Sequence, residues 1–291
     1  MDSLIKKIIW KEIKICPSLY LNILLFLIII VAVIISYLIE PNPGKELSPP
    51  TWEHIFGTDD SGEDIFLRTI VAIRRYFFPG LLAVGIVTLL GGIILGVGSS
   101  SIWSEVFIGK VGISLTSSIM DVLESFPKYI TILLIITFLD PPQFRDIVIV
   151  LGVLNSAKLG RLVKLKIESL QKNYFIEANE ALGLGKFDIV FRHILFYNCL
   201  PIFIIQASLQ MAEVIMIEIG VNYLASTSPW GYYPFGKNYF GAILVDARDK
   251  FEAWWFTFFP VIMVVTNILV FYGLADSINR RIKLHQHVGL E

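Results

Sequence analysis

The chain has 291 residues, of which 55% are hydrophobic and 17% are charged, and its mean hydropathy is +0.69. Soluble globular domains carry about 25% charged residues, so the composition excludes an ordinary soluble domain and predicts a membrane protein. The net charge of −1 provides no general attraction to nucleic acid. The two cysteines, Cys16 and Cys199, exclude a disulfide framework and offer no metal-binding spacing.

Apolar runs along the chain are long enough to cross a bilayer, which takes about 20 helical residues. We expect helices, because every backbone polar group must be satisfied inside lipid. The predicted fold is therefore all-α and polytopic, with one membrane domain over residues 19–281 between tails at 1–18 and 282–291. The six predicted spans are residues 19–39, 77–99, 114–139, 147–164, 200–224 and 255–275.

The distribution of lysine and arginine predicts the orientation. Residues 1–16 are basic, but the apolar run after them is long and lacks a small-residue cleavage site, which favours a retained span over a signal peptide. With seven further basic residues from Lys158 to Arg192, three at the C-terminal end and Lys110, the side that holds both termini carries 15 lysines and arginines and the other side carries 8. By the positive-inside rule both termini are cytoplasmic, and the long segments 40–76 and 225–253 are outer loops.

The first outer segment holds several acidic residues close together. The positions required for an EF-hand calcium site are not filled, since Gly57 stands at the first position and Arg68 at the last. A structural role is favoured, in which Ser61 caps a helix with Asp64 three residues later. That helix would present Phe66, Ile70 and Ile73 to the membrane surface.

Polar residues interrupt the predicted spans, and such residues are functional candidates by default. Glu124 and Lys128 are four residues apart, so a local ion pair would satisfy both. Glu213 and Glu218 have no obvious local partner, which makes them the better candidates for lining a pathway. The alternative is that one of them caps a helix or pairs with a neighbouring subunit. The intramembrane polar residues are Asp121, Glu124, Lys128, Glu213, Glu218 and Asn267.

Residues 171–196 predict two short amphipathic helices outside the membrane. Apolar residues recur at helical spacing in each half, from Tyr174 to Leu182 and from Phe187 to Ile194. Gly183 and Gly185 lie between the halves, and glycine can take the left-handed geometry that ends a helix. The apolar stripe either enters a partner's groove or packs on the chain's own helix ends.

The segment beginning Glu177-Ala178 and reaching Gly183, with Ile194-Leu195 and Leu200-Pro201 downstream, resembles the EAA loop of ABC importer permeases. Other segments resemble the C-type permeases of peptide and nickel importers, in the same order along the chain. The resemblance extends over about residues 52–281, and its segments are 56–64, 120–127, 217–224, 253–255 and 274–276.

This resemblance implies a type I ABC importer permease in a bacterial inner membrane. It further implies a heterodimer with a B-type permease, two ATPase subunits that bind ATP and Mg, and an extracytoplasmic solute-binding protein. The residues implied in ATPase coupling are Glu177, Ala178, Gly183, Leu184, Phe187 and Arg192. The candidates for the translocation path are Asp121, Ser125, Glu213, Glu218 and Asn222.

The chain has no phosphate-binding glycine loop of its own and no hydrolase motif, so we expect a transport subunit without cofactor, metal site or enzyme activity. No cluster of His, Cys or Met lies within the spans, which favours peptides over nickel as cargo. A rival class is a stand-alone proton-coupled transporter or channel that uses Asp121, Glu213 and Glu218. The aromatic outer segment 225–253 is either an interfacial belt or a cap that faces the binding protein.

Overall fold

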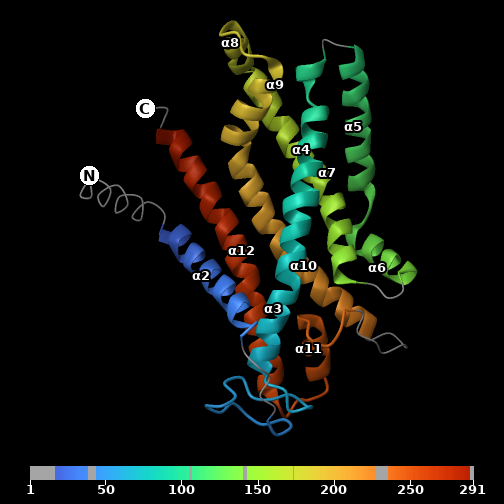
Figure 1. Cartoon of the computed structure of the whole chain (residues 1–291), viewed down its shortest axis with the longest axis vertical. Helices are drawn as coiled ribbons and strands as arrows, with labels where there is room; N and C mark the ends of the chain where they lie inside the picture. The colour runs from blue at the N-terminus through green and yellow to red at the C-terminus, as the bar shows by residue number, and fades with distance from the viewer. Residues whose placement is uncertain are drawn as a thin grey trace, which may run out of the picture. The chain divides into compact units, whose positions relative to one another are not determined.

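The computed structural model describes residues 17–38, 44–104, 107–139, 143–172, 174–226 and 235–288, and helices dominate these ranges (Figure 1). The predicted all-helical fold is confirmed for this part of the chain. The α-helices are α2 Pro17–Ile35, α3 Ile65–Leu82, α4 Leu89–Gly98, α5 Phe107–Ser125, α6 Lys128–Phe138, α7 Phe144–Lys172, α8 Phe175–Ala181, α9 Lys186–Asp188, α10 Leu200–Ser226, α11 Phe240–Ala247 and α12 Trp254–Val288. The π-helical segments are η1 Ala83–Thr88 and η3 Ile189–Cys199, and η2 Ser101–Trp103 is a 3₁₀ turn.

Four helical stretches in the described part of the chain are long and apolar enough to span a membrane. They are Ser18–Ile35, Ile65–Gly98, Lys186–Ser226 and Trp254–Arg280. These stretches contain most of the first, second, fifth and sixth predicted spans, so six spans are not confirmed. The second stretch begins at Ile65, twelve residues earlier than predicted, which shortens the segment 40–76 that was predicted as an outer loop.

The third and fourth predicted spans differ from expectation. The third is broken, because α5 ends at Ser125 and α6 begins at Lys128. Pro127 lies between them, and proline disfavours the helical conformation of the residue before it. The fourth lies within the 29-residue helix α7, whose lysines and arginines keep it outside the set of strongly apolar helices.

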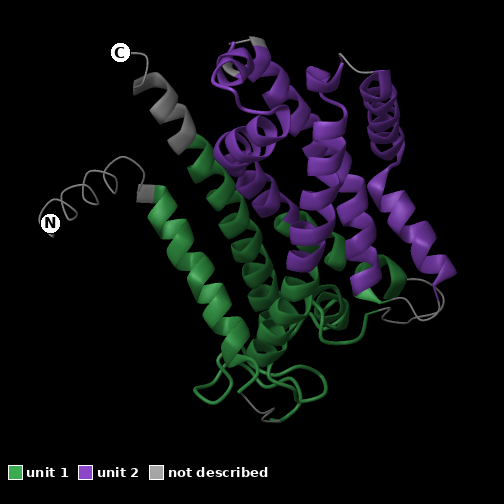
Figure 2. Cartoon of the chain, turned by 45° about the horizontal axis from the view of Figure 1, so that its top comes forward, with its two compact units in different colours: residues 1–79, 141–144, 211–291 green, residues 80–140, 145–210 purple. Residues whose placement is uncertain are grey.

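The chain divides into two compact units, coloured separately in Figure 2. Unit 1 is residues 1–79, 141–144 and 211–291, and unit 2 is residues 80–140 and 145–210. In unit 1, α2 packs against α12: Asn22 Nδ2 donates to Ser277 Oγ at 3.0 Å, and the rings of Phe26 and Phe271 are 5.8 Å apart. A Cβ at Gly273 would lie 2.5 Å from Asn22 Oδ1, so glycine permits this approach.

Residues 44–64 of unit 1 are ordered by two aspartates. Asp59 Oδ1 accepts the backbone N–H groups of Ser61 and Glu63, both at 2.8 Å. Asp64 caps α3, because its Oδ1 accepts the N–H of Leu67 at 3.1 Å while its Oδ2 lies 2.8 Å from His54 Nδ1. The predicted cap, Ser61, was therefore wrong by three residues. The helix start at Ile65 follows from Asp64 instead.

The guanidinium of Arg68 joins residues 44–64 to α11. The side chain is 6% exposed and forms an ion pair with Asp59. Its Nη2 also donates to Asp246 Oδ2 at 3.0 Å and to the carbonyl of Lys237 at 2.9 Å. A single buried cation thus connects residues 59–68 with residues 237–246, which are far away in the sequence.

In unit 2, α4 packs closely on α7 through glycines. A Cβ at Gly92 would lie 2.7 Å from Leu159, and one at Gly96 would lie 2.6 Å from Val163 and 2.7 Å from the carbonyl of Gly160. Small residues four apart are typical of close helix pairs in membranes. This contact positions α7, which leads directly into the segment that carries the candidate coupling residues.

Candidate functional site

The helix α8 ends in a sharp bend at Gly183. The N–H of Leu184 donates to the carbonyl of Asn179 at 3.2 Å, and the N–H of Gly183 donates to that of Glu180 at 2.9 Å. These two bonds, with φ of +84° at Gly183, form a Schellman motif. The predicted bend at Gly183 is confirmed. Gly185 instead has an extended backbone, with φ of −71° and ψ of 150°.

After the bend, the chain does not form a separate second short helix as predicted. The helix that begins at Lys186 continues through η3 and α10 to Ser226. The buried residues Ile189, Ile194 and Cys199 recur every five positions, which matches the i→i+5 bonding of a π-helix. The predicted α-helical stripe combined the buried Val190 and Ile194 with Phe187 and Phe191, which are exposed.

The apolar residues of the segment 171–196 fall into a buried set and an exposed set. Leu182 is 80% exposed and Phe187 is 66% exposed. Of the predicted stripe, Val190 and Ile194 pack on the chain's own helices, and the rest remains available to a partner. The buried set is Ile176, Ile189, Val190, Ile194 and Leu195, packed with Val97, Ile102, Leu159, Val163 and Ile167.

The turn between α4 and α5 contributes to the same end of unit 2 as α8 and α9 (Figure 1). The ring of Trp103 lies 5.1 Å from that of Phe187, which stacks on Phe191 at 6.2 Å. Ser101 Oγ donates to Gln171 Oε1 at 2.6 Å. Sequence reasoning missed this turn, because nothing in the local pattern of residues 99–104 relates it to a segment 80 residues later.

Among the coupling candidates, Glu177, Ala178, Gly183 and Arg192 are exposed and Leu184 is half-buried. A small pocket of about 150 Å³ lies beside them in unit 2, with two carboxylates in its lining. The pocket is lined by Ser101, Ile102, Ser104, Gln171, Ile176, Glu177, Glu180 and Lys186. The arrangement presents apolar side chains and charges together at one end of the unit.

Charged residues also meet along α5 and α7 of unit 2. Arg161 Nη2 donates to Asp121 Oδ1 at 2.9 Å, and Arg161 Nε donates to Glu124 Oε1 at 2.9 Å. The expected pair of Glu124 with Lys128 was wrong, because the break at Pro127 places them on different helices. Lys128 Nζ instead donates to Asn155 Oδ1 at 2.5 Å.

The predicted path residues in α10 of unit 1 are buried within this chain. Glu218 is 0% exposed, and its Oε1 accepts from Asn222 Nδ2 at 2.9 Å and from the backbone N–H of Gly241 at 3.1 Å. Gly241 lies in the first turn of α11, so Glu218 caps that helix from outside. Glu218 Oε2 and Asn222 Oδ1 have no hydrogen-bond partner among the described residues.

The remaining path candidates lie elsewhere. Ser125 is exposed at the end of α5, and Glu213 is half-buried one and a half turns before Glu218. The structure therefore brings Glu218 and Asn222 together and keeps Asp121 with Arg161 and Glu124. It groups the candidates into one buried cluster in unit 1 and one exposed cluster in unit 2.

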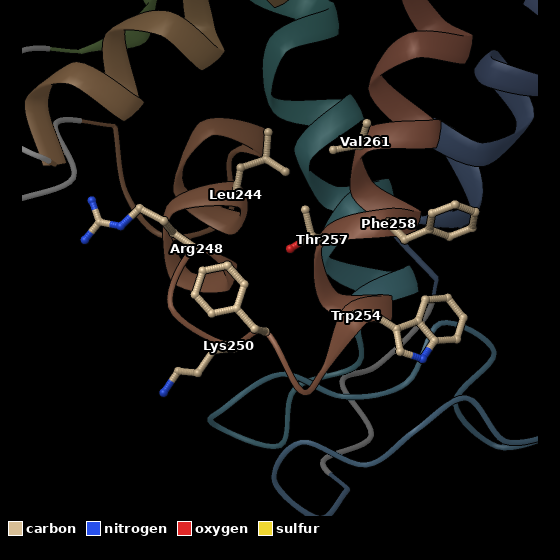
Figure 3. A pocket seen from close by; sticks show the side chains of 8 residues that line it. Leu244, Arg248, Lys250, Trp254, Thr257, Phe258 and Val261 are labelled. Carbon is tan, nitrogen blue, oxygen red and sulfur yellow. The ribbon is translucent and has the colours of Figure 1, made fainter.

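A groove of about 610 Å³ lies between α11 and the start of α12 in unit 1 (Figure 3). Trp254, Phe258 and Val261 form its apolar side on α12, with Arg248 and Lys250 at its edge. Trp254 is 57% exposed at the point where a candidate span begins. This position is typical of interfacial aromatic residues. Trp230, Tyr232 and Tyr233 of the segment 225–253 lie outside the described residues.

An all-helical membrane chain with an exposed helix–bend–helix at one end and charged residues along its helices has the features of a membrane transport subunit. Residues 92–284 match the family described as binding-protein-dependent transport system inner membrane component, and the chain belongs to this family. The predicted family and the predicted permease role are confirmed.

Relatives of this chain support the same assignment. It is 31% identical over 249 residues to the dipeptide transport system permease protein DppC of Alkalihalophilus pseudofirmus, covering 84% of this chain and 77% of the relative. It is 26% identical over 272 residues to a putative peptide transport system permease protein of Brucella abortus, covering 90% of this chain and 87% of the relative. A putative peptide permease protein of Brucella suis is 25% identical over 242 residues, covering 82% and 76%.

The chain is therefore a multi-pass inner-membrane permease subunit of a binding-protein-dependent ABC transport system. It is a non-catalytic component, in agreement with the prediction that it is not an enzyme. Family membership implies an ATPase and a binding protein as the other parts of the system.

Proposed function

We propose that this chain forms half of a translocation pathway for peptides and is driven by a separate ATPase that docks on residues 171–196. The observation that carries the proposal is the bend at Gly183, which leaves Leu182 and Phe187 exposed while Ile176 and Ile194 anchor the segment. An exposed apolar surface on a rigid support is typical of a docking element.

Peptides are the proposed cargo because the relatives named above are dipeptide and peptide permeases. In this proposal the second permease is of the B type, and ATP with Mg is bound by the two ATPase subunits. Docking involves Glu177, Ala178, Gly183, Leu184, Phe187 and Arg192.

We propose six spans. Four of them are the strongly apolar stretches, α5 together with α6 forms another, and α7 forms the last. Both termini and the segment 171–196 are then cytoplasmic, as the lysine and arginine distribution indicates. Exposed charges and a helix break are tolerated within a membrane where the helices face protein or water. The proposed path residues are Asp121, Ser125, Glu213, Glu218 and Asn222.

The test is uptake into vesicles that contain the chain with its partner subunits and binding protein. Labelled short peptides are expected to enter only with ATP, and nickel measured in parallel is not. Nickel uptake without peptide uptake would move the chain to the metal branch of the family. Peptide uptake driven by a proton gradient without ATP would favour the stand-alone transporter instead.

A further inference from the structure

A short turn on unit 2 lies beside the segment that is proposed to dock the ATPase. It consists of residues 99–104 and contains η2, and we call it the η2 turn. Ile102 of this turn is buried in the same apolar cluster as Ile176 of α8. Ser101 Oγ donates to Gln171 Oε1 at 2.6 Å. The η2 turn is therefore fixed against α8 and against the end of α7.

The turn is also held by hydrogen bonds to the end of α4. The carbonyl oxygen of Val97 accepts the backbone N–H of Ser100 at 3.2 Å, Ser100 Oγ at 2.7 Å and Trp103 Nε1 at 3.0 Å. A Cβ at Gly109 of α5 would lie 2.0 Å from the carbonyl oxygen of Trp103, so glycine lets α5 pack directly against the turn. A surface that is already ordered loses little conformational freedom when a partner binds.

Large apolar side chains remain exposed around this ordered turn. The ring of Trp103 lies 5.1 Å from that of Phe187, which is 66% exposed. Phe107 and Ile108, which follow the turn at the start of α5, are each 80% exposed. The exposed apolar side chains of residues 171–196 therefore have exposed apolar neighbours on a second element. Extended apolar patches of this kind are typical of interaction sites.

A pocket of about 150 Å³ lies between the η2 turn and α8. A cavity of about this volume holds a group the size of benzene, whereas small-molecule sites usually measure about 300–1,000 Å³. The pocket therefore has room for one side chain of a partner rather than for a separate ligand. Its lining includes the carboxylates of Glu177 and Glu180 and the ammonium of Lys186. Because both charge signs are present, the pocket does not select an isolated ion.

We propose that the η2 turn is a second docking surface for the ATPase, which inserts one side chain into the pocket between the turn and α8. The inference rests on the proposed function, in which the ATPase docks on residues 171–196. Glu177 and Lys186 line the pocket from that segment, and Ser101 and Ser104 line it from the turn. A protein seated on residues 171–196 therefore meets the rim of the same pocket, which identifies the ATPase as the occupant.

Contact at the η2 turn gives the ATPase a direct connection to α5. Residues 171–196 lead into α7 and α10, whereas the η2 turn connects α4 with α5. Two of the proposed path residues, Asp121 and Ser125, lie on α5. Movement of the ATPase at the turn thus reaches these residues without passing through α7.

The test measures how fast a thiol reagent labels the variants Ser104→Cys, Leu182→Cys and Ser169→Cys. Cys16 is replaced by serine in all three, and Cys199 is buried. The chain is studied with the other permease in vesicles opened to the reagent on both sides, without and with the ATPase. At about ten times its dissociation constant, the ATPase leaves about a tenth of the permease free, so labelling of Ser104→Cys and Leu182→Cys should fall about tenfold.

Ser169→Cys is the matched control. Ser169 is exposed on α7, and two positions along a helix place it about 200° around the axis from Gln171, away from the pocket. Its labelling is expected to stay unchanged when the ATPase is added. Attaching a bulky maleimide to Ser104→Cys before the ATPase is added should abolish ATP-driven peptide uptake, and the same modification at Ser169→Cys should leave uptake intact. Uptake by the unmodified variants verifies that they fold and assemble.

Three results would overturn the second docking surface. Fast labelling of Ser104→Cys with and without the ATPase, while Leu182→Cys is protected, would leave docking on residues 171–196 intact and remove the turn from the interface. Slow labelling of Ser104→Cys before the ATPase is added would show that lipid or the other permease covers the turn. Failure of the ATPase to protect Leu182→Cys would overturn docking on residues 171–196 itself, so failure of the proposed function is distinguishable from failure of this inference alone.

Discussion

Replacing Gly183 with valine should disable coupling without disturbing the membrane domain. Gly183 has φ of +84°, and a Cβ built there meets no atom within 4 Å. The penalty is therefore conformational, since no neighbour is displaced. The left-handed region costs an L-residue about 1–2 kcal/mol, which lowers the population of the bent form by a factor of roughly 5–30.

The assay is ATP-driven peptide uptake, with insertion and partner binding checked separately. Gly183→Asn is the first control, because asparagine accepts the left-handed conformation more readily. Gly185→Val is the second, because Gly185 is extended and its nearest contact is 4.0 Å away. Both controls should retain most of the uptake. Undiminished uptake by Gly183→Val, or equal losses at both glycines, would refute the reasoning.

Three further predictions concern other parts of the chain. Glu218→Leu should lower the free energy of unfolding by about 1–3 kcal/mol, because it removes the acceptor for the α11 backbone. Glu218→Gln keeps an acceptor and should cost less. Equal amide-exchange protection of α11 in both variants would show that Glu218 does not cap this helix. Glu177→Lys should weaken co-purification of the ATPase by reversing an interfacial charge, and a fully retained ATPase would make Glu177 an ordinary surface residue. A cysteine at the exposed position Ser61 should react with an impermeant thiol reagent from outside. A cysteine at Ser169, which is also exposed, should react only after permeabilisation. The reverse pattern would overturn the orientation.

The sequence was a good guide where a single local signal decides the structure. The bend at Gly183 was predictable because glycine is the residue that takes positive φ most readily. The span over residues 200–224 was predictable from continuous apolar composition, and the helix α10 covers Leu200–Ser226. The family could be recognised because its motifs occur in order along the chain.

Features that depend on distant contacts were not predictable in the same way. The partner of Glu124 is Arg161, 37 residues away, rather than Lys128 at helical spacing. The carboxylate of Glu218 accepts the backbone N–H of Gly241, which lies on a helix that no pattern in α10 predicts as its neighbour. Local rules place a charge on a helix, but the neighbouring helix decides what that charge contacts.

The buried guanidinium of Arg68 has a consequence for how unit 1 opens. Because it bonds Asp59, Asp246 and the carbonyl of Lys237 at once, neither residues 44–64 nor α11 can detach without leaving a buried charge poorly compensated. The two segments should therefore behave as one cooperative unit. Their amide protons should exchange with a shared opening free energy, and a protease that gains access to one segment should gain access to both.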